Sequence, residues 1–99
     1  MSNREILIEA IKSKKMVDFS YEYKPISRAA PHAIYISSKG NENLDAFQYG
    51  GFSKSGNLPA WRNFSLLKIM NLKMLNKKFK IADGYRSNSS KYNKYIYKI

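Results

Sequence analysis

The chain of 99 residues contains no cysteine, which excludes disulfide bonds, thiolate metal sites and cysteine nucleophiles. It has one histidine and only seven acidic residues, so few groups are available for acid–base catalysis or metal binding. Gly50, Gly51 and Gly56 lack the G-x-x-x-x-G-K-[ST] spacing of a phosphate-binding loop. We therefore expect a protein that is not an enzyme and that holds neither a metal ion nor another cofactor.

Long apolar runs are also absent. No stretch approaches the length of a membrane span or of the apolar core of a signal peptide. The sequence therefore predicts a cytoplasmic protein without a membrane partner, and the lack of cysteine suits a reducing compartment. Because no repeat or linker interrupts the chain, we expect a single domain over residues 1–99.

Acidic residues are scarce where basic residues are most frequent. The whole chain has 18 Lys and Arg against seven Asp and Glu, a net charge of +11. Residues 1–67 contain nine basic and six acidic residues, whereas residues 68–99 contain nine basic residues and one acidic residue. This asymmetry is typical of proteins that bind nucleic acid, another polyanion or an acidic protein. A lysine-rich surface that only maintains solubility is the alternative.

The N-terminal residues 1–15 predict a helix. Ser2 and Glu5 fit the S-x-x-E capping box. Four apolar residues recur at helical spacing and form one stripe: Ile6, Leu7, Ala10 and Ile11. The helix therefore needs an apolar surface on which to pack.

Short alternating segments follow the helix and predict strands. They cover residues 17–23, 28–37, 44–52 and 61–64, then a strand that follows a turn near residue 66, and finally residues 94–99. Pro31 predicts a strand edge or a bulge in the second of them. The sequence therefore predicts a mainly β (α+β) fold. Its N-terminal helix packs on a small antiparallel SH3-like or Sm-like β-barrel of five to six strands (residues 16–76), before a basic C-terminal segment (77–99).

The order of several short motifs resembles a known family. After the helix come "FSY" at 19–21, R-x-x-P-H at 28–32, "GNENL" with "AFQ" at 40–48, and "WRNFSLLKI" at 61–69. From about Ile6 to Leu75 this order is similar to the WYL domain and its short stand-alone relatives, which have an Sm-like barrel behind an N-terminal helix. Two features depart from the family: Glu42-Asn43-Leu44 replaces the Trp-Tyr-Leu tripeptide, and no helix-turn-helix is present.

The resemblance implies a non-enzymatic ligand sensor. WYL domains occur in bacterial regulators and defence proteins, where they bind nucleic acid or nucleotide-like ligands. By position, Arg28, Pro31 and His32 match the family's R-x-x-P strand, and Arg62 with Phe64 matches its R-x-F element. Any DNA targeting by such a module would need a partner.

Trp61 and Arg62 form the most distinctive local pair. An arginine fork suits phosphate or carboxylate, and an indole face can stack on a base. Adjacent strand residues point to opposite faces, so both line one surface only where the strand bulges. In the alternative interpretation Trp61 packs against the helix or barrel end, and Arg62 pairs with an acidic residue such as Asp45.

His32 and Gln48 are candidate ligand-binding residues with structural alternatives. His32 shares its predicted face with apolar residues, which also suits a satisfied, partly buried imidazole. Gln48 is in phase with Leu44 and Ala46, so its amide either braces a bulge near Gly50 or faces a polar pocket. We therefore predict a loop over 50–59 whose base brings Gln48 close to Arg62.

The end of the chain mixes tyrosines with basic residues, as single-stranded nucleic-acid sites do. The mixture comprises Tyr85, Arg86, Lys91, Tyr92, Lys94, Tyr95, Tyr97 and Lys98. A lysine-protected edge strand explains it equally well. The predicted phosphate contacts are Lys77, Lys78, Lys80 and Arg86, and the predicted ligand-binding residues are Arg28, His32, Gln48, Trp61 and Arg62.

The expected function is non-catalytic binding of nucleic acid or a nucleotide-like anion in a bacterial regulatory or defence context. The alternative is a protein–protein interaction or homo-oligomerisation module without a nucleic-acid role, with a second copy in a homodimer or another protein as its partner.

Overall fold

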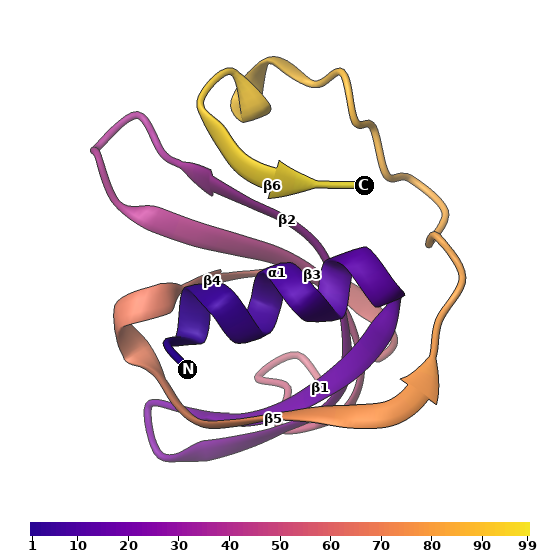
Figure 1. Cartoon of the computed structure of the whole chain (residues 1–99). Coiled ribbons are helices and arrows are strands. Elements are labelled where there is room, and N and C mark those ends of the chain that lie inside the picture. Colours follow the sequence, from indigo (N-terminus) through magenta and orange to yellow (C-terminus); the bar gives the residue numbers. More distant parts are fainter.

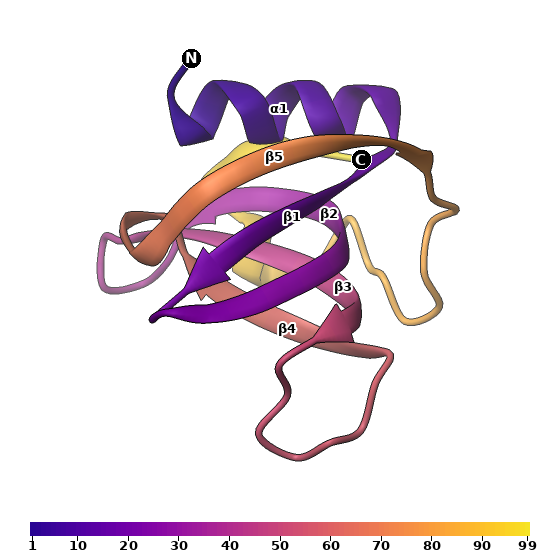
Figure 2. The same ribbon diagram turned by 90° about the horizontal axis from the view of Figure 1, so that it is seen from below.

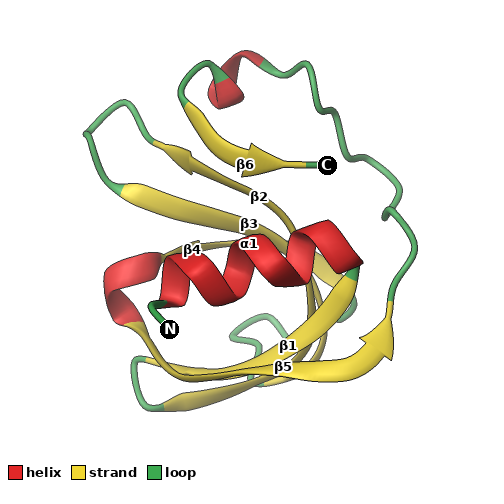
Figure 3. Ribbon diagram, viewed as in Figure 1, coloured by secondary structure: helices red, strands yellow, loops and turns green.

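One helix and six strands follow one another along residues 1–99, all of which the computed structural model describes (Figure 3). In chain order the elements are α1 (Asn3–Ser13), β1 (Lys15–Tyr21), β2 (Lys24–Ile36), β3 (Glu42–Gly51), β4 (Ala60–Ser65), the 3-10 turn η1 (Leu66–Lys68), β5 (Ile69–Lys78), the 3-10 turn η2 (Ser90–Tyr92) and β6 (Tyr95–Lys98). The predicted mainly β fold with an N-terminal helix on an antiparallel sheet is confirmed.

All strand pairs are antiparallel, and their order is β4-β3-β2-β1-β5, with β6 paired to β2. Figure 1 shows α1 lying across the sheet, between the β1–β5 pair and β6. In Figure 2 the strands lie below α1, with β3 and β4 farthest from it, and the β3–β4 loop projects away from the helix. β4 and β5 end the strand order and are joined by η1, but no ladder pairs them.

Local sequence signals determine where α1 begins and where the first hairpin turns. The capping box is present: Ser2 Oγ accepts the Glu5 N–H, and the Glu5 carboxylate accepts the Ser2 N–H. The strands predicted at residues 17–23 and 28–37 imply a turn at residues 24–27, but the turn lies earlier, at Glu22 and Tyr23, whose φ angles are 51° and 66°. Two consecutive positive φ angles characterise a two-residue hairpin turn of type I′, so residues 24–27 belong to β2.

β2 is the central strand because it is paired along both edges. One edge pairs with β3 from Ile26 to Ile36, whereas the other pairs with β1 from Lys24 to Ala29 and with β6 from Ala33 to Tyr35. A bulge lies between Pro31 and Ala33, where neither β1 nor β6 is paired. Pro31 has no N–H to donate, so this gap suits it, and the predicted bulge is confirmed.

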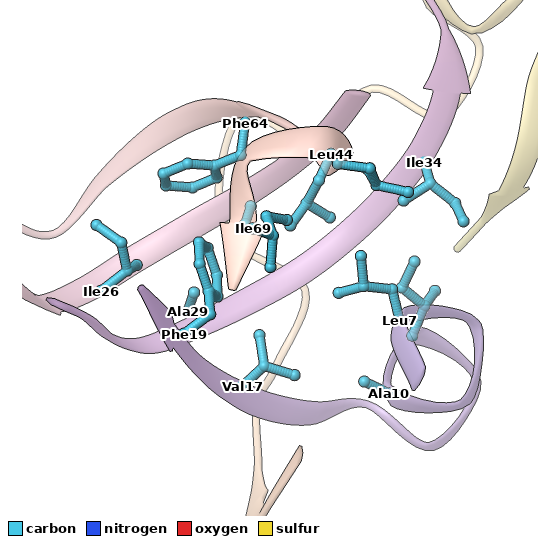
Figure 4. Packing of buried hydrophobic residues seen from close by; sticks show 13 residues of the cluster. Leu7, Ala10, Val17, Phe19, Ile26, Ala29, Ile34, Leu44, Phe64 and Ile69 are labelled. Atoms are coloured by element: carbon cyan, nitrogen blue, oxygen red, sulfur yellow. The ribbon is translucent and has the colours of Figure 1, made fainter. Parts of the chain in front are cut away.

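The apolar core lies between α1 and one face of the sheet. Figure 4 shows its side chains converging from the helix and from five strands. Leu7 and Ala10 of α1 are completely buried, as are Val17, Ile34 and Leu44 of the sheet. Phe19 and Phe64 meet edge to face with ring centroids 5.0 Å apart. The full burial of each large apolar side chain contributes roughly 1.5–3 kcal/mol, so this face holds the sheet and α1 together.

The opposite face of the sheet is covered by the C-terminal residues, which we call the C-terminal segment (residues 79–99). Although the sequence suggested a boundary at residue 76, β5 continues to Lys78 and the chain then returns to the sheet. Phe79, Ala82 and Tyr92 are buried, and Tyr92 clusters with Ala33 and Tyr35 of β2. The C-terminal segment therefore builds a second, largely aromatic cluster on the face away from α1.

Truncation of Leu44 tests the location of the core. Leu44 is fully buried whereas Leu67 is 91% exposed. We expect Leu44→Ala to lower the free energy of unfolding by about 2–5 kcal/mol, because the truncation leaves a cavity. Leu67→Ala is the matched control, and urea unfolding should detect little change in it. Equal losses for the two variants would contradict the observed packing.

Candidate functional site

A cavity of about 360 Å³ opens between the outer face of β3 and β4 and the C-terminal segment, and we call it the outer cavity. Its lining combines aromatic and basic side chains, among them Trp61, Arg62, Tyr85, Arg86, Lys91 and Tyr92. These residues come from parts of the chain that are distant in sequence. The return of the C-terminal segment to the sheet therefore creates the cavity.

Trp61 is held in place as one wall of the outer cavity. Because Phe64 faces the core, the alternation of β4 directs Trp61 to the outer face. The indole Nε1–H donates to the Asp83 carbonyl at 2.9 Å, and the ring lies nearly parallel to Tyr85 at a centroid distance of 6.1 Å. Gly84 has a φ of 90°, and a Cβ added there would lie 3.2 Å from Trp61 Nε1. Glycine therefore permits this close approach of the loop.

Asp45 forms a buried carboxylate at the base of the outer cavity. It is 5% exposed. Its oxygens accept hydrogen bonds from Tyr35 Oη (3.1 Å), Tyr92 Oη (2.7 Å) and Asn63 Nδ2 (2.8 Å). Lys91 Nζ completes the set as an ion pair at 2.7 Å. These donors compensate the cost of burying the charge and fix the C-terminal segment on β3.

The tyrosines around Asp45 are donors rather than titrating groups near neutral pH. Burial, with the Asp45 charge as the second cause, raises the pKa of Tyr35 to about 12. Burial is also the main cause that raises the pKa of Tyr92, and its hydrogen bond to Asp45 adds to the shift. Both phenols therefore remain protonated and keep donating to the carboxylate.

Arg62 lines two cavities. Its guanidinium donates to the hydroxyls of Ser53 (2.9 Å) and Ser55 (3.2 Å) and to the Trp61 carbonyl (3.2 Å). The alternative ion pair between Arg62 and Asp45 is not formed, because Asp45 pairs with Lys91. Arg62 therefore retains its charge without a carboxylate within 4 Å.

A second cavity, the inner cavity, lies at the base of the β3–β4 loop and has a volume of about 330 Å³. Gln48 and Arg62 both line it, as expected from the alternation. Gln48 Nε2 donates to the carbonyls of Gly50 and Phe52, each at 2.8 Å, so the amide also braces the strand end. Its Oε1 is buried and has no protein partner.

The remaining predicted ligand-binding residues lie outside both cavities. Arg28 is exposed, its backbone N–H donates to Asp18 at 2.8 Å, and its guanidinium lies beside Gly50. Lys77 and Lys78 end β5, and Lys80 follows it, all exposed. The structure therefore brings Trp61, Arg62 and Arg86 together at the outer cavity, whereas the three lysines lie outside it at the end of β5.

His32 packs against Trp61 and Tyr85, two residues that line the outer cavity. It is completely buried. Its Nδ1–H donates to the Ala30 carbonyl (2.8 Å), and its Nε2 accepts the Ala82 N–H (3.0 Å). The ring also packs against Trp61, Phe79 and Tyr85, with centroids 4.8–5.1 Å away. Both nitrogens are therefore occupied, and the imidazole anchors the C-terminal segment to the sheet.

Sequence reasoning missed Asp45, Asn63, Gly84 and Ser89 as cavity residues. Asp45 and Asn63 are register partners across β3 and β4, which is a relation that alternation within one strand does not reveal. The tyrosine and lysine mixture at residues 85–98 did carry a signal, because Tyr85, Arg86, Lys91 and Tyr92 all line the outer cavity.

No three His, Cys, Asp or Glu side chains gather where they could hold a metal ion. No helix in the structure has the length and apolar character needed to span a membrane.

Because of His32, the stability of the fold is expected to depend on pH. Burial lowers the pKa of this imidazole from its ordinary value of 6.5, so the unfolded chain binds the proton more readily. The stabilisation is therefore complete above that ordinary value and is lost as the pH falls below it. We expect the urea midpoint to fall between about pH 7.5 and about pH 5.

His32→Gln is the control for this effect, because glutamine can accept the Ala82 N–H but does not titrate. His32 is the only histidine in the chain. The variant should be less stable near neutral pH but should show a flatter pH dependence. An unchanged drop in the variant would mean that other groups cause it.

In comparisons with known proteins, no family model, no curated protein and no solved structure matches this chain.

Proposed function

We propose that this protein is a non-catalytic module that binds nucleic acid or a nucleotide-like anion in the outer cavity. One observation carries the proposal: a single cavity combines the rings of Trp61 and Tyr85 with the cationic side chains of Arg62 and Arg86. Aromatic rings next to cations are the combination with which proteins hold single-stranded bases and their phosphates.

Size and charge both support this ligand class. A volume of about 360 Å³ lies at the lower end of the range of small-ligand sites, so the cavity suits one nucleotide unit. Lys91 balances the charge of Asp45, while neither Arg62 nor Arg86 has an acidic partner within 4 Å. Both positive charges are therefore free to attract a phosphate, although three Arg62 N–H donors already bond Ser53, Ser55 and the Trp61 carbonyl. The net charge of +11 also attracts polyanions to the surface.

We also propose that the module is WYL-like and serves a bacterial regulatory or defence protein. Support for this context comes from the order of the motifs between Ile6 and Leu75 in the sequence. The helix before an antiparallel sheet of five consecutive strands is compatible with it, although such a fold is shared by proteins of many functions.

Binding in the outer cavity can be measured through the chain's only tryptophan, Trp61, which lines it. We expect a labelled single-stranded twelve-nucleotide DNA or RNA to quench the Trp61 fluorescence and to bind less tightly as the salt rises. Arg86→Gln removes an exposed phosphate contact and is expected to weaken binding by about tenfold, the effect of a lost charge-assisted contact of about 1.4 kcal/mol.

Lys39→Gln is the matched control, because Lys39 is exposed, lines neither of the two cavities and has the same charge as Arg86. It should bind nearly as the parent does. Equal weakening by the two variants would show that only the overall charge matters, and an unchanged Trp61 signal at low salt would refute binding in the cavity.

The open edge of β5 favours a second candidate function, self-association or contact with another protein. β5 ends the strand order, so one of its edges has no partner strand. Met70 and Met74 of β5 are 52% and 37% exposed, and Leu67 just before it is 91% exposed. Exposed apolar side chains beside an open edge are typical of interaction surfaces.

Light scattering after gel filtration tests this candidate. If β5 forms an interface, the parent is expected to exceed the 11.5 kDa of one chain, and replacing Met70 and Met74 together by lysine should restore that mass. A mass of one chain at all concentrations would eliminate self-association.

A further inference from the structure

We propose that five lysines at one end of the sheet bind the phosphate backbone of a single nucleic-acid strand, one base of which enters the outer cavity. We call them the lysine edge: Lys14, Lys15, Lys77, Lys78 and Lys80. The inference rests on the function proposed above and narrows its ligand class. The ligand becomes a strand of several nucleotides rather than a free nucleotide.

The fold brings the lysine edge together from two distant parts of the sequence. α1 ends at Lys14, whose φ of 54° turns the chain directly into β1. Lys15 then lies opposite Lys78 in the β1–β5 ladder, and the Phe79 N–H donates to the Lys14 carbonyl at 2.9 Å. Lys77 and Lys80 flank these residues in sequence, so five positive charges share one corner of the molecule.

No acidic side chain neutralises the lysine edge. The three ion pairs of the molecule involve Arg4, Lys68 and Lys91, all elsewhere. Directly opposed residues of an antiparallel ladder have Cα atoms about 4.5–5.5 Å apart, and like charges there are unfavourable. The negative end of the α1 dipole explains a lysine at position 14 but not those on β5. A polyanion would relieve the repulsion among all five.

The lysine edge lies within reach of the outer cavity. Lys80 and Gly84, which lines that cavity, are four residues apart, so their Cα atoms are separated by at most about 14 Å. Successive phosphates of one strand are closer together than this interval, so more than one nucleotide is needed to cover it. Figure 1 shows the connecting chain leading from the end of β5 toward η2. One short strand can therefore contact both regions, which a single nucleotide cannot do.

The test compares two double variants that lower the net charge equally. Lys15→Gln with Lys78→Gln removes the opposed pair, and Lys39→Gln with Lys68→Gln removes two exposed lysines elsewhere. Each lost phosphate contact makes the slope of log K against log salt shallower by about 0.7 for a single strand. We expect the first variant to flatten the slope for a single-stranded twelve-nucleotide DNA by about 1.4, and the second to change it little. Thermal melting should show that both variants fold.

Uridine monophosphate is the control ligand that distinguishes binding of a strand from binding of a single nucleotide. We expect it to quench the Trp61 fluorescence and to bind with an affinity well below that of the twelve-nucleotide strand. Its affinity should be the same for the parent and for the Lys15/Lys78 variant. Equal affinities for the nucleotide and the strand would overturn the inference, as would equal slopes for the two double variants.

Two further results would overturn the inference, and each would show what the lysine edge or the outer cavity does instead. If Arg86→Gln weakens strand binding but the Lys15/Lys78 variant does not, the outer cavity is the site and the lysine edge is not. If phosphatidylglycerol vesicles lose affinity for the Lys15/Lys78 variant while strand binding is unchanged, the lysine edge serves a lipid surface. Failure of the strand and the nucleotide alike to quench Trp61 would refute the proposed function itself.

Discussion

The hydrogen bond from the Ala82 N–H to His32 Nε2 is the constraint on which the rest of the outer face depends. Residues 79–99 contain little regular structure, with only η2 and the short strand β6, so their position is set by contacts to the sheet. A buried imidazole in the bulge of β2 supplies the polar acceptor for that contact, and its ring supplies apolar surface for Trp61 and Tyr85. Together with the hydrogen bond from Trp61 Nε1–H to the Asp83 carbonyl, this anchor holds the loop that carries Gly84 and Arg86 against the sheet, where the loop forms one wall of the outer cavity.

The buried carboxylate of Asp45 completes the attachment at the other end of the C-terminal segment. A lone carboxylate at this depth would be strongly unfavourable, so the two tyrosine hydroxyls and Lys91 are necessary partners rather than additions. Because Tyr92 and Lys91 belong to the C-terminal segment while Asp45 belongs to β3, satisfying the charge also fixes the two parts in register. In the same network Lys91 is paired with Asp45, so Arg62 and Arg86 are the cations of the outer cavity that have no acidic partner. Electrostatic compensation thus decides which basic residues of the outer cavity are left without an acidic partner.

The elements of this fold were predictable because each depends on neighbouring residues. The capping box of Ser2 and Glu5, the alternation of the strands and the bulge at Pro31 are all local signals, and the structure contains each of them. The predicted position of the first turn was wrong because Glu22 and Tyr23 adopt positive φ angles, although neither is glycine or asparagine, the residues by which such a turn is recognised in a sequence. The site was only partly predictable. Trp61 and Arg86 were found from their chemistry, whereas the pairing of Asp45 with Lys91 depends on a strand register and a chain return that no local pattern encodes.

The two faces of the sheet differ in what they bury and in the charge that they carry. The face toward α1 buries aliphatic and aromatic side chains in one cluster, and the inner cavity opens at the base of the β3–β4 loop. The face away from α1 is closed by the C-terminal segment. Residues 68–99, which include it, carry nine basic residues against one acidic residue. Concentrating the charge there places it on the chain that forms the wall of the outer cavity and on the end of β5 that leads into that wall. Because like charges oppose the compact packing of this basic stretch, buried polar partners are needed to hold it on the sheet. His32 accepts the Ala82 N–H, and Asp45 accepts the Tyr92 hydroxyl and pairs with Lys91.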